Sequence, residues 1–176
     1  MNFKKFLPVE NYTLKTKLSV EEVRNRIANK IEPKKNFRLK LFSNSASKPY
    51  EGYVAASVFK INRIISYRNS FLPIIDGQIY SIAGKTYINI EMNILKWVLA
   101  FLIIIMGIFI IGSLAFTGIF SLVSKDSIHG NFMFHPLFQF LMPLFFYMVV
   151  YFSFKFESKK SKEFLARLLE GEEVTT

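Results

Sequence analysis

The sequence contains no cysteine, which excludes disulfides, thiolate catalysis and cysteine-based zinc sites. It also lacks a phosphate-binding loop, a dinucleotide-binding fingerprint, an H-E-x-x-H motif and a G-x-S-x-G nucleophile elbow. We therefore predict no catalytic residue and no cofactor, and the sequence favours a non-enzymatic protein. Asp126, His129 and His135 could ligate a metal, but the H-x5-H spacing is not a recognised ligand pattern, so no metal site is predicted.

Charged residues are absent from two long stretches, residues 97–124 and residues 136–154. The first has 28 residues, of which 17 are Ile, Leu, Val or Phe. About 20 apolar residues span the hydrocarbon core of a bilayer, and few soluble helices are apolar on every side. We therefore expect a transmembrane helical hairpin over residues 97–154, with spans at about 97–119 and 136–154 and an outer loop at 120–135.

The positive charge is confined to one part of the chain. Residues 1–96 hold 17 Lys and Arg against 7 Asp and Glu, whereas residues 97–176 hold 6 of each. Four lysines follow the second span, while the outer loop offers only Lys125, which Asp126 cancels. An excess of Lys and Arg marks the cytoplasmic side of a membrane. The sequence thus predicts a multi-pass protein of the cytoplasmic membrane with both termini in the cytosol.

Polar residues follow a stripe on the first span. Ser113, Thr117 and Ser121 are spaced by four, and Gln139 lies in the outer half of the second span. In an antiparallel hairpin Gln139 would face the outer end of the stripe, and such interhelical hydrogen bonds contribute about 1 kcal/mol. We expect these residues to pack the hairpin together. The alternative is a substrate path lined by the same groups.

Residues 1–96 predict a basic cytosolic domain of the α+β class. Tyr12, Leu14 and Thr16 alternate with polar residues as in a half-buried strand. Ser19 and Glu22 then form a capping box, which starts a helix that runs to Ile31 at helical spacing. Alternating patterns follow at residues 37–41, 50–56, 57–68, 73–81 and 86–93. The order is a strand, a helix and an antiparallel meander of about five strands.

Residues 155–176 predict a cytosolic amphipathic helix followed by an acidic tail. Phe164, Leu165, Leu168 and Leu169 form the apolar face, and Gly171 is a plausible stop. Nothing between Phe154 and Ser161 breaks a helix, so this helix can continue directly from the second span. Either the cytosolic sheet or the membrane surface must cover the apolar face.

Four neighbouring residues form a candidate polar patch for a headgroup or a partner: Tyr67, Arg68, Asn69 and Ser70. Arg68 would supply the bidentate fork for a phosphate or carboxylate. The alternative is an ordinary surface turn, since Asn and Ser favour turns. Arg63 and Asp76 are expected to pair across neighbouring strands as a structural ion pair.

A basic face in the first forty residues is the strongest functional indication: Lys15, Lys17, Arg24, Arg26, Lys30, Lys34 and Lys35, followed by Arg38 and Lys40. Anionic lipid attracts such surfaces by about 1 kcal/mol for each Lys or Arg held near it. A general bias towards positive charge in the cytosol would also produce part of this excess. Nucleic acid is not expected as a partner, because no aromatic platform or recognition motif accompanies the charges.

Two resemblances accompany these patterns. The order of strand, helix, sheet and terminal helix resembles the helix-grip architecture of START-like domains, which handle lipids and polyketides. The segments ISYRNSFLPIIDG and FKFESKKSKEFL are similar to segments of small uncharacterised bacterial two-span membrane proteins. The first resemblance implies an apolar ligand between sheet and terminal helix, and the second implies a bacterial cell membrane.

The resulting hypothesis is an integral membrane protein that acts as a binding or accessory protein. Its basic domain would dock on anionic lipid headgroups and bind an apolar ligand, a segment of a protein partner, or a second copy of the chain. One alternative is a membrane enzyme acting on lipid, with Arg68, Asn69 and Asp76 near its site. Another is a structural subunit of a membrane complex, whose hairpin packs through the polar stripe of the first span.

Overall fold

The computed structural model describes residues 7–33, 48–65, 71–123 and 134–174, with the backbone alone at residues 120–123 and 134–140. The chain divides into two compact units, which we call the α+β unit (Met1–Leu95 with Ser153–Thr176) and the helical unit (Lys96–Phe152). One helix, α3 (Phe134–Leu168), contributes to both, since the boundary at Ser153 lies within it. The terminal amphipathic helix is therefore a continuation of the second apolar stretch.

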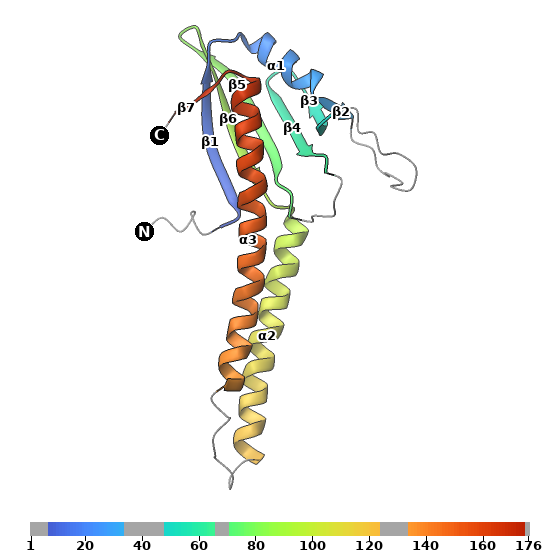
Figure 1. The fold of residues 1–176 in the computed structure, drawn as a ribbon, viewed down its shortest axis with the longest axis vertical. Coiled ribbons are helices and arrows are strands. Elements are labelled where there is room, and N and C mark those ends of the chain that lie inside the picture. The colour runs from blue at the N-terminus through green and yellow to red at the C-terminus, as the bar shows by residue number, and fades with distance from the viewer. Residues whose placement is uncertain (1–6, 34–47, 66–70, 124–133, 175–176) are drawn as a thin grey trace. The chain divides into compact units, whose positions relative to one another are not determined.

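The α+β unit contains a mixed seven-stranded sheet (Figure 1). Its strands lie in the order β2-β3-β4-β5-β6-β1-β7, and β2 and β3 are parallel while the other neighbours are antiparallel. In chain order the elements are β1 (Val9–Thr16), α1 (Val20–Asn29), β2 (Ile31–Pro33), β3 (Tyr50–Val54), β4 (Val58–Arg63), β5 (Ile74–Ile82), β6 (Lys85–Asn93) and, after α3, β7 (Glu172–Val174). The predicted α+β class is confirmed.

The sheet is not the simple meander that the sequence predicts. β1 lies beside β6 over its whole length, so the first and last strands of the N-terminal part are neighbours. The spacing predicts Ile31 within the helix, but α1 ends at Asn29 and Ile31 pairs with Tyr50 in the parallel β2–β3 ladder. A β-branched residue two positions before Pro33 is poorly suited to continue a helix. The strand expected at residues 37–41 lies outside the described residues.

The capping box is confirmed. The Ser19 hydroxyl accepts a hydrogen bond from the Glu22 amide at 3.2 Å, and the Glu22 carboxylate accepts one from the Ser19 amide at 2.8 Å. These two bonds satisfy backbone donors that the first turn of α1 would otherwise leave without partners. Val23 and Ile27 point from α1 into the core, as their spacing predicts.

The second part of α3, from Ser153 onward, lies across one face of the sheet (Figure 1). Alternate strand residues point towards it and are buried, and these include Leu14, Phe59, Ile61, Ile75, Ile79, Ile88, Ile90 and Met92. On the helix, Phe154, Leu165 and Leu169 are buried against them, whereas Phe164 and Leu168 are half-buried. The sequence leaves two candidates to cover the apolar face of this helix, the sheet and the membrane surface. In the structure the sheet covers it.

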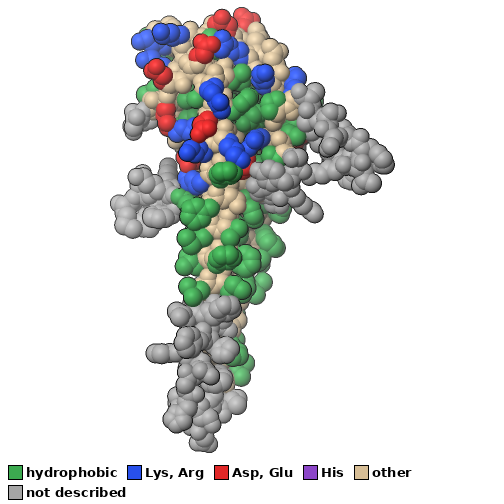
Figure 2. Space-filling view, in the orientation of Figure 1, with side chains coloured by type: hydrophobic (Ala, Val, Ile, Leu, Met, Phe, Trp, Pro, Cys, Tyr) green, Lys and Arg blue, Asp and Glu red, His purple; other side chains and the backbone are tan. Residues whose placement is uncertain are grey.

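The helical unit consists of α2 (Lys96–Val123) and the first part of α3. Within the described residues, one helix is long and apolar enough to cross a membrane, at Lys96–Ile119 with a mean hydropathy of 2.9. Only 11% of its apolar window is buried, whereas the core helix of a soluble protein would be mostly buried. Figure 2 shows hydrophobic side chains over this unit and Lys, Arg, Asp and Glu over the α+β unit.

Candidate functional site

Polar side chains interrupt the apolar interface between α3 and the sheet. Glu157, Ser158 and Ser161 lie on the same face of α3 as Phe154 and Leu165, and all five are buried. From the sheet, Tyr50 of β3 and Arg63 of β4 reach this face of the helix, and Tyr12 of β1 lies beside the helix near Lys162. We call these six polar residues the polar seam: Tyr12, Tyr50, Arg63, Glu157, Ser158 and Ser161.

The Glu157 carboxylate is the only acidic group of the polar seam. Its side chain is 1% exposed, and it pairs with the Arg63 guanidinium at 2.5 Å and with the Lys160 ammonium at 3.2 Å. A buried carboxylate is costly unless cations and hydrogen bonds compensate it. Lys160 also lies over the exposed ring of Phe156, with its Nζ 3.9 Å from the ring centroid. The Arg63–Glu157 pair joins β4 to α3.

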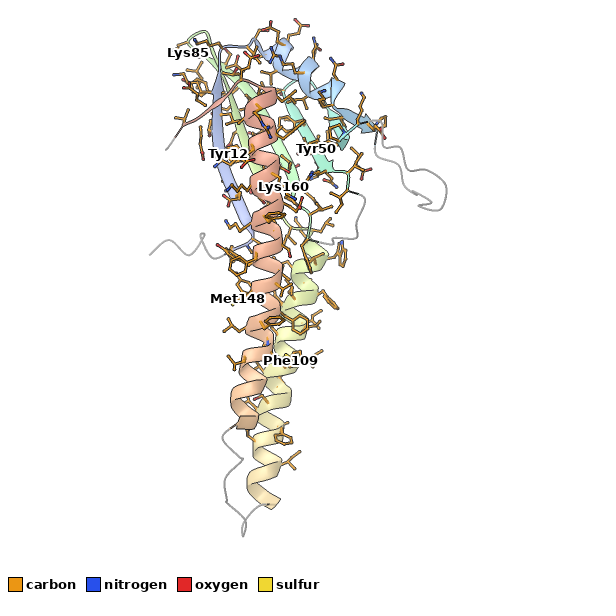
Figure 3. All side chains as sticks on the ribbon, viewed as in Figure 1. Tyr12, Tyr50, Lys85, Phe109, Met148 and Lys160 are labelled. Atoms are coloured by element: carbon orange, nitrogen blue, oxygen red, sulfur yellow. The ribbon has the colours of Figure 1, made fainter. Side chains whose placement is uncertain are left out.

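Two tyrosines flank α3 (Figure 3). The Tyr50 hydroxyl donates to the Ser161 hydroxyl at 3.3 Å, and the Tyr50 ring lies 4.8 Å from that of Phe164. On the other side of the helix, the Lys162 ammonium lies 4.7 Å from the centre of the Tyr12 ring. Burial raises the pKa of both tyrosines above the usual value of 10.0, so both phenols are neutral at physiological pH.

Two hydroxyls of the polar seam lack hydrogen-bond partners among the described residues, namely those of Tyr12 and Ser158. Both oxygen atoms are buried, and a buried hydroxyl without a partner costs about 1–3 kcal/mol. Because the one carboxylate is ion-paired and no histidine is present, the polar seam contains no pair of nucleophile and base. Its contacts position the helix on the sheet.

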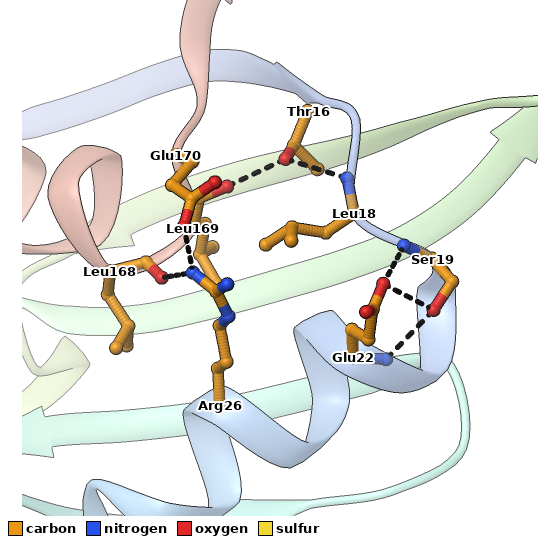
Figure 4. Close-up of polar contacts among 8 residues, drawn as sticks. All are labelled: Thr16, Leu18, Ser19, Glu22, Arg26, Leu168, Leu169 and Glu170. Carbon is orange, nitrogen blue, oxygen red and sulfur yellow. Dashed lines mark hydrogen bonds and ion pairs between the residues drawn. The ribbon is translucent and has the colours of Figure 1, made fainter.

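The end of α3 is held by a second group of contacts (Figure 4). The Thr16 hydroxyl donates to the Leu169 carbonyl at 2.7 Å, and the Arg26 guanidinium donates to the Leu168 carbonyl at 3.1 Å. Arg26 also pairs with the Glu170 carboxylate at 2.6 Å. The last carbonyls of a helix have no partner within it, so Thr16 and Arg26 act as a cap provided by distant parts of the chain.

After this cap the chain reverses and forms a strand that the sequence patterns do not predict. Glu170 adopts a left-handed conformation with φ of 49°, and the Gly171 amide donates to the Ala166 carbonyl at 3.0 Å. β7 then pairs antiparallel with residues 13–15 of β1. The Glu173 carboxylate pairs with Lys162 at 2.7 Å. The predicted acidic tail is thus partly an edge strand.

In the structure, the residues of the predicted basic face have different roles. Arg26 belongs to the cap, and Arg24 pairs with Glu21 of the same helix at 3.2 Å. Lys17 and Lys30 are exposed and Lys15 is half-exposed. Six other candidate residues lie outside the described residues: Lys34, Lys35, Tyr67, Arg68, Asn69 and Ser70. Arg38 and Lys40 do as well.

The predicted ion pair between Arg63 and Asp76 is wrong. Asp76 pairs with Lys60 at 3.0 Å, because the register of β4 and β5 places these two residues directly opposite each other. Arg63 instead reaches Glu157 on α3. Strand patterns alone did not define this register. The signal available in the sequence was Glu157 itself, a charged residue on the same helix face as Phe154 and Leu165, which indicates a buried ion pair.

The polar stripe of α2 is engaged within its own helix where it is described. Ser113 is buried, and the Thr117 hydroxyl donates to the backbone carbonyls of Ser113 and Leu114 at 3.0 and 2.9 Å. The side chains of Ser121 and Gln139 lie outside the described residues. The helical unit also has an apolar groove of about 430 Å³, lined by Met106, Ile110, Pro143, Leu144 and Tyr147.

Among the described residues, no group of three or more His, Cys, Asp or Glu side chains could hold a metal ion. Asp126, His129 and the side chain of His135 lie outside that part of the chain. In the comparisons with known proteins, no protein-family model and no curated protein matches this sequence. The resemblances to START-like domains and to small bacterial membrane proteins therefore stay predictions.

Proposed function

We propose that the chain is a multi-pass protein of the cytoplasmic membrane, in which α2 and the first part of α3 form a transmembrane hairpin. The observation that carries the proposal is the exposure of α2, whose apolar side chains lie on nearly all of its surface. Exposing so much apolar surface to water is strongly unfavourable, and lipid removes that cost. The excess of Lys and Arg in residues 1–96 supports a cytosolic location for both termini and the α+β unit.

The α+β unit is proposed as a binding or accessory module and not as an enzyme. The absence of a nucleophile and base in the polar seam supports this choice. Several residues between the sheet and α3, among them Ile88, Ile90 and Leu165, are 0% exposed, so no water-sized space adjoins them. A filled interface of this kind favours a protein partner on the surface over an apolar ligand enclosed between sheet and helix.

Anionic headgroups are proposed to contact α3 just beyond the apolar stretch. Lys159 and Phe156 are exposed there, and Lys160 lies over the Phe156 ring. Aromatic and basic residues next to a span favour the interface between membrane and water. Lys15 and Lys17 of the basic face flank Thr16, which pairs with Thr86, roughly 23 Å along β6 from Asn93, near which the chain leaves the α+β unit.

Single-cysteine labelling tests the topology, because the chain has no cysteine of its own. Ser127→Cys in the predicted outer loop should react with a membrane-impermeant maleimide in intact cells. Ser57→Cys, at an exposed position before β4, should react only after the membrane is opened. Reaction of Ser57→Cys in intact cells would refute the topology. Recovery of the wild-type chain in buffer without detergent would refute the membrane assignment itself.

A further inference from the structure

β7 covers a short part of the outer edge of β1. It has three residues, all of them exposed, and it pairs with residues 13–15 of β1, a strand of eight residues. No described strand pairs with residues 9–11 on that side. A strand edge with free N–H and C=O groups is a template for another extended segment. Among the described residues, the edge of β1 thus extends beyond the part that β7 covers.

The side chains around this edge favour an acidic segment. On the face towards α3, Glu173 pairs with Lys162. On the opposite face, Glu172 lies directly across from Lys15 in the β1–β7 register, and opposite charges in such cross-strand positions attract. Where β7 begins, Glu170 pairs with Arg26. The segment after α3 therefore shows which chemistry this edge accepts, namely backbone pairing with carboxylates on both faces.

The interactions that bind β7 to the sheet are weaker than those that bind the end of α3. The side chains of Lys162 and Glu173 are 35% and 46% exposed, and exposed ion pairs of this kind contribute about 0–1 kcal/mol each. A ladder of three residues adds few hydrogen bonds. By contrast, the Thr16 hydroxyl bonds to the Leu169 carbonyl in a buried setting. β7 can therefore leave the edge while the cap of α3 stays in place.

We propose that the outer edge of β1 is a docking site for an extended acidic segment of a partner protein, and that β7 occupies this site as a tethered competitor. A partner strand gains where β7 does not, because it can pair with residues 9–11 as well as 13–15. The two lysines beside β7, Lys15 and Lys162, then face carboxylates of the partner segment. It does not depend on the membrane assignment, since all its residues lie in the α+β unit.

The test measures binding of a fluorescein-labelled synthetic peptide, EGEEVTT, which copies residues 170–176. Binding is measured to three proteins in a non-ionic detergent. They are the unaltered full chain, a chain that ends at Gly171, and a full chain that carries both Glu172→Lys and Glu173→Lys. A tethered segment competes at an effective concentration of about 1 mM, so both altered chains should bind the peptide more tightly than the unaltered chain, by about ten-fold for a peptide Kd of about 0.1 mM. The affinity should fall as salt rises.

The controls separate this site from general electrostatic attraction. The full chain with Glu163→Lys and Arg167→Glu, two exposed positions on α3, should behave like the unaltered chain. A peptide with lysine at both central glutamates should not bind any of these proteins. A chain ending at Gly171 that lacks a cooperative thermal transition is not folded. In that case the binding of the peptide to the chain with the two lysines tests the proposal.

Three outcomes would overturn the proposal. One is equal binding of the peptide to all three proteins, and another is no binding to altered chains that retain their thermal transition. The third is a dimer of the unaltered chain that disappears on truncation at Gly171, because β7 would then exchange between copies instead of yielding to a partner.

Discussion

Arg63 of β4 and Glu157 of α3 are separated by 94 residues in the sequence, and their side chains meet at 2.5 Å. Arg63 is 29% exposed, whereas Glu157 is 1% exposed, so the two partners do not depend on each other equally. Removing the cation leaves a buried carboxylate that still pairs with Lys160. Removing the carboxylate leaves a guanidinium that can still reach water.

This asymmetry predicts unequal effects of the two single substitutions. Arg63→Ala should lower the free energy of unfolding by about 2–3 kcal/mol, less than for a fully buried pair because Lys160 still contributes. Glu157→Gln should lower it by about 1–2 kcal/mol. Thermal and urea unfolding of the full chain in detergent, followed by circular dichroism, measures both.

The double substitution Arg63→Met with Glu157→Leu serves as the control for this pair. It replaces both charges by apolar side chains of similar size, and such replacements are often nearly neutral. We expect the double variant to be more stable than Arg63→Ala. If it is less stable than both single variants, the pair has a role other than mutual neutralisation.

The Tyr12 hydroxyl is buried and has no hydrogen-bond partner among the described residues. We therefore predict that the free energy of unfolding changes with pH in the alkaline range. Burial raises the pKa of this phenol, so the folded state keeps its proton at a pH where the unfolded state releases it. The stability associated with the neutral phenol is fully present below pH 10.0, the usual pKa, and decreases as the pH rises above it. Tyr12→Phe should therefore be as stable as the wild type, or more stable, at pH 7 and should show a shallower loss of stability above pH 10.

Urea unfolding between pH 7 and pH 11 measures this difference, with Tyr53→Phe, which alters an exposed tyrosine, as the control. A decrease of more than about 1 kcal/mol for Tyr12→Phe at pH 7 would mean that the hydroxyl has a partner in solution.

The cap at the end of α3 predicts different effects for two arginines of α1. Arg26→Ala removes the hydrogen bond to the Leu168 carbonyl and the ion pair with Glu170, so it should cost about 1–2 kcal/mol. Arg24→Ala removes only a local pair with Glu21 on the helix surface and should cost less than about 0.5 kcal/mol. Thermal unfolding distinguishes them, and equal effects would contradict the capping role of Arg26.

Local patterns predicted the elements well where the signal lies within a few residues. The capping box at Ser19 and Glu22 and the alternation of Ile88, Ile90 and Met92 each depend on neighbours in the sequence, and each is observed. The same patterns did not predict which elements meet. The spacing of residues identifies a buried face, but register and pairing depend on contacts between residues far apart in the chain.

The candidate site shows this limit most clearly. Arg26 has the appearance of a surface charge in the sequence, and its acceptor on α3 is 142 residues away. β7 contains two glutamates in three residues, a composition with little strand propensity, and it forms beside the open edge of β1, next to Lys15 of β1 and Lys162 of α3. In both cases tertiary context decides, so a single sequence without contacts could not reveal the site.

Gly77 predicts the sharpest packing effect in the sheet. It lies opposite Phe59 in the β4–β5 pair, and the Phe59 ring covers it so closely that a Cβ atom would fall 2.0 Å from the ring. Phe59 is buried and cannot move aside without disturbing the core under α3. Gly77→Ala should therefore lower the free energy of unfolding by about 1–3 kcal/mol, as overpacked cores do.

A double-mutant cycle with Phe59→Leu tests the cause of that loss. Phe59→Leu alone should be destabilising through lost burial, but in its presence the added methyl group of Gly77→Ala has room. The two substitutions should then be less destabilising together than the sum of their separate effects, with a coupling energy of at least about 0.5 kcal/mol in urea unfolding. Additive effects would mean that the ring leaves room for a Cβ atom at position 77 in solution, and the close approach of Phe59 to Gly77 would not explain the glycine.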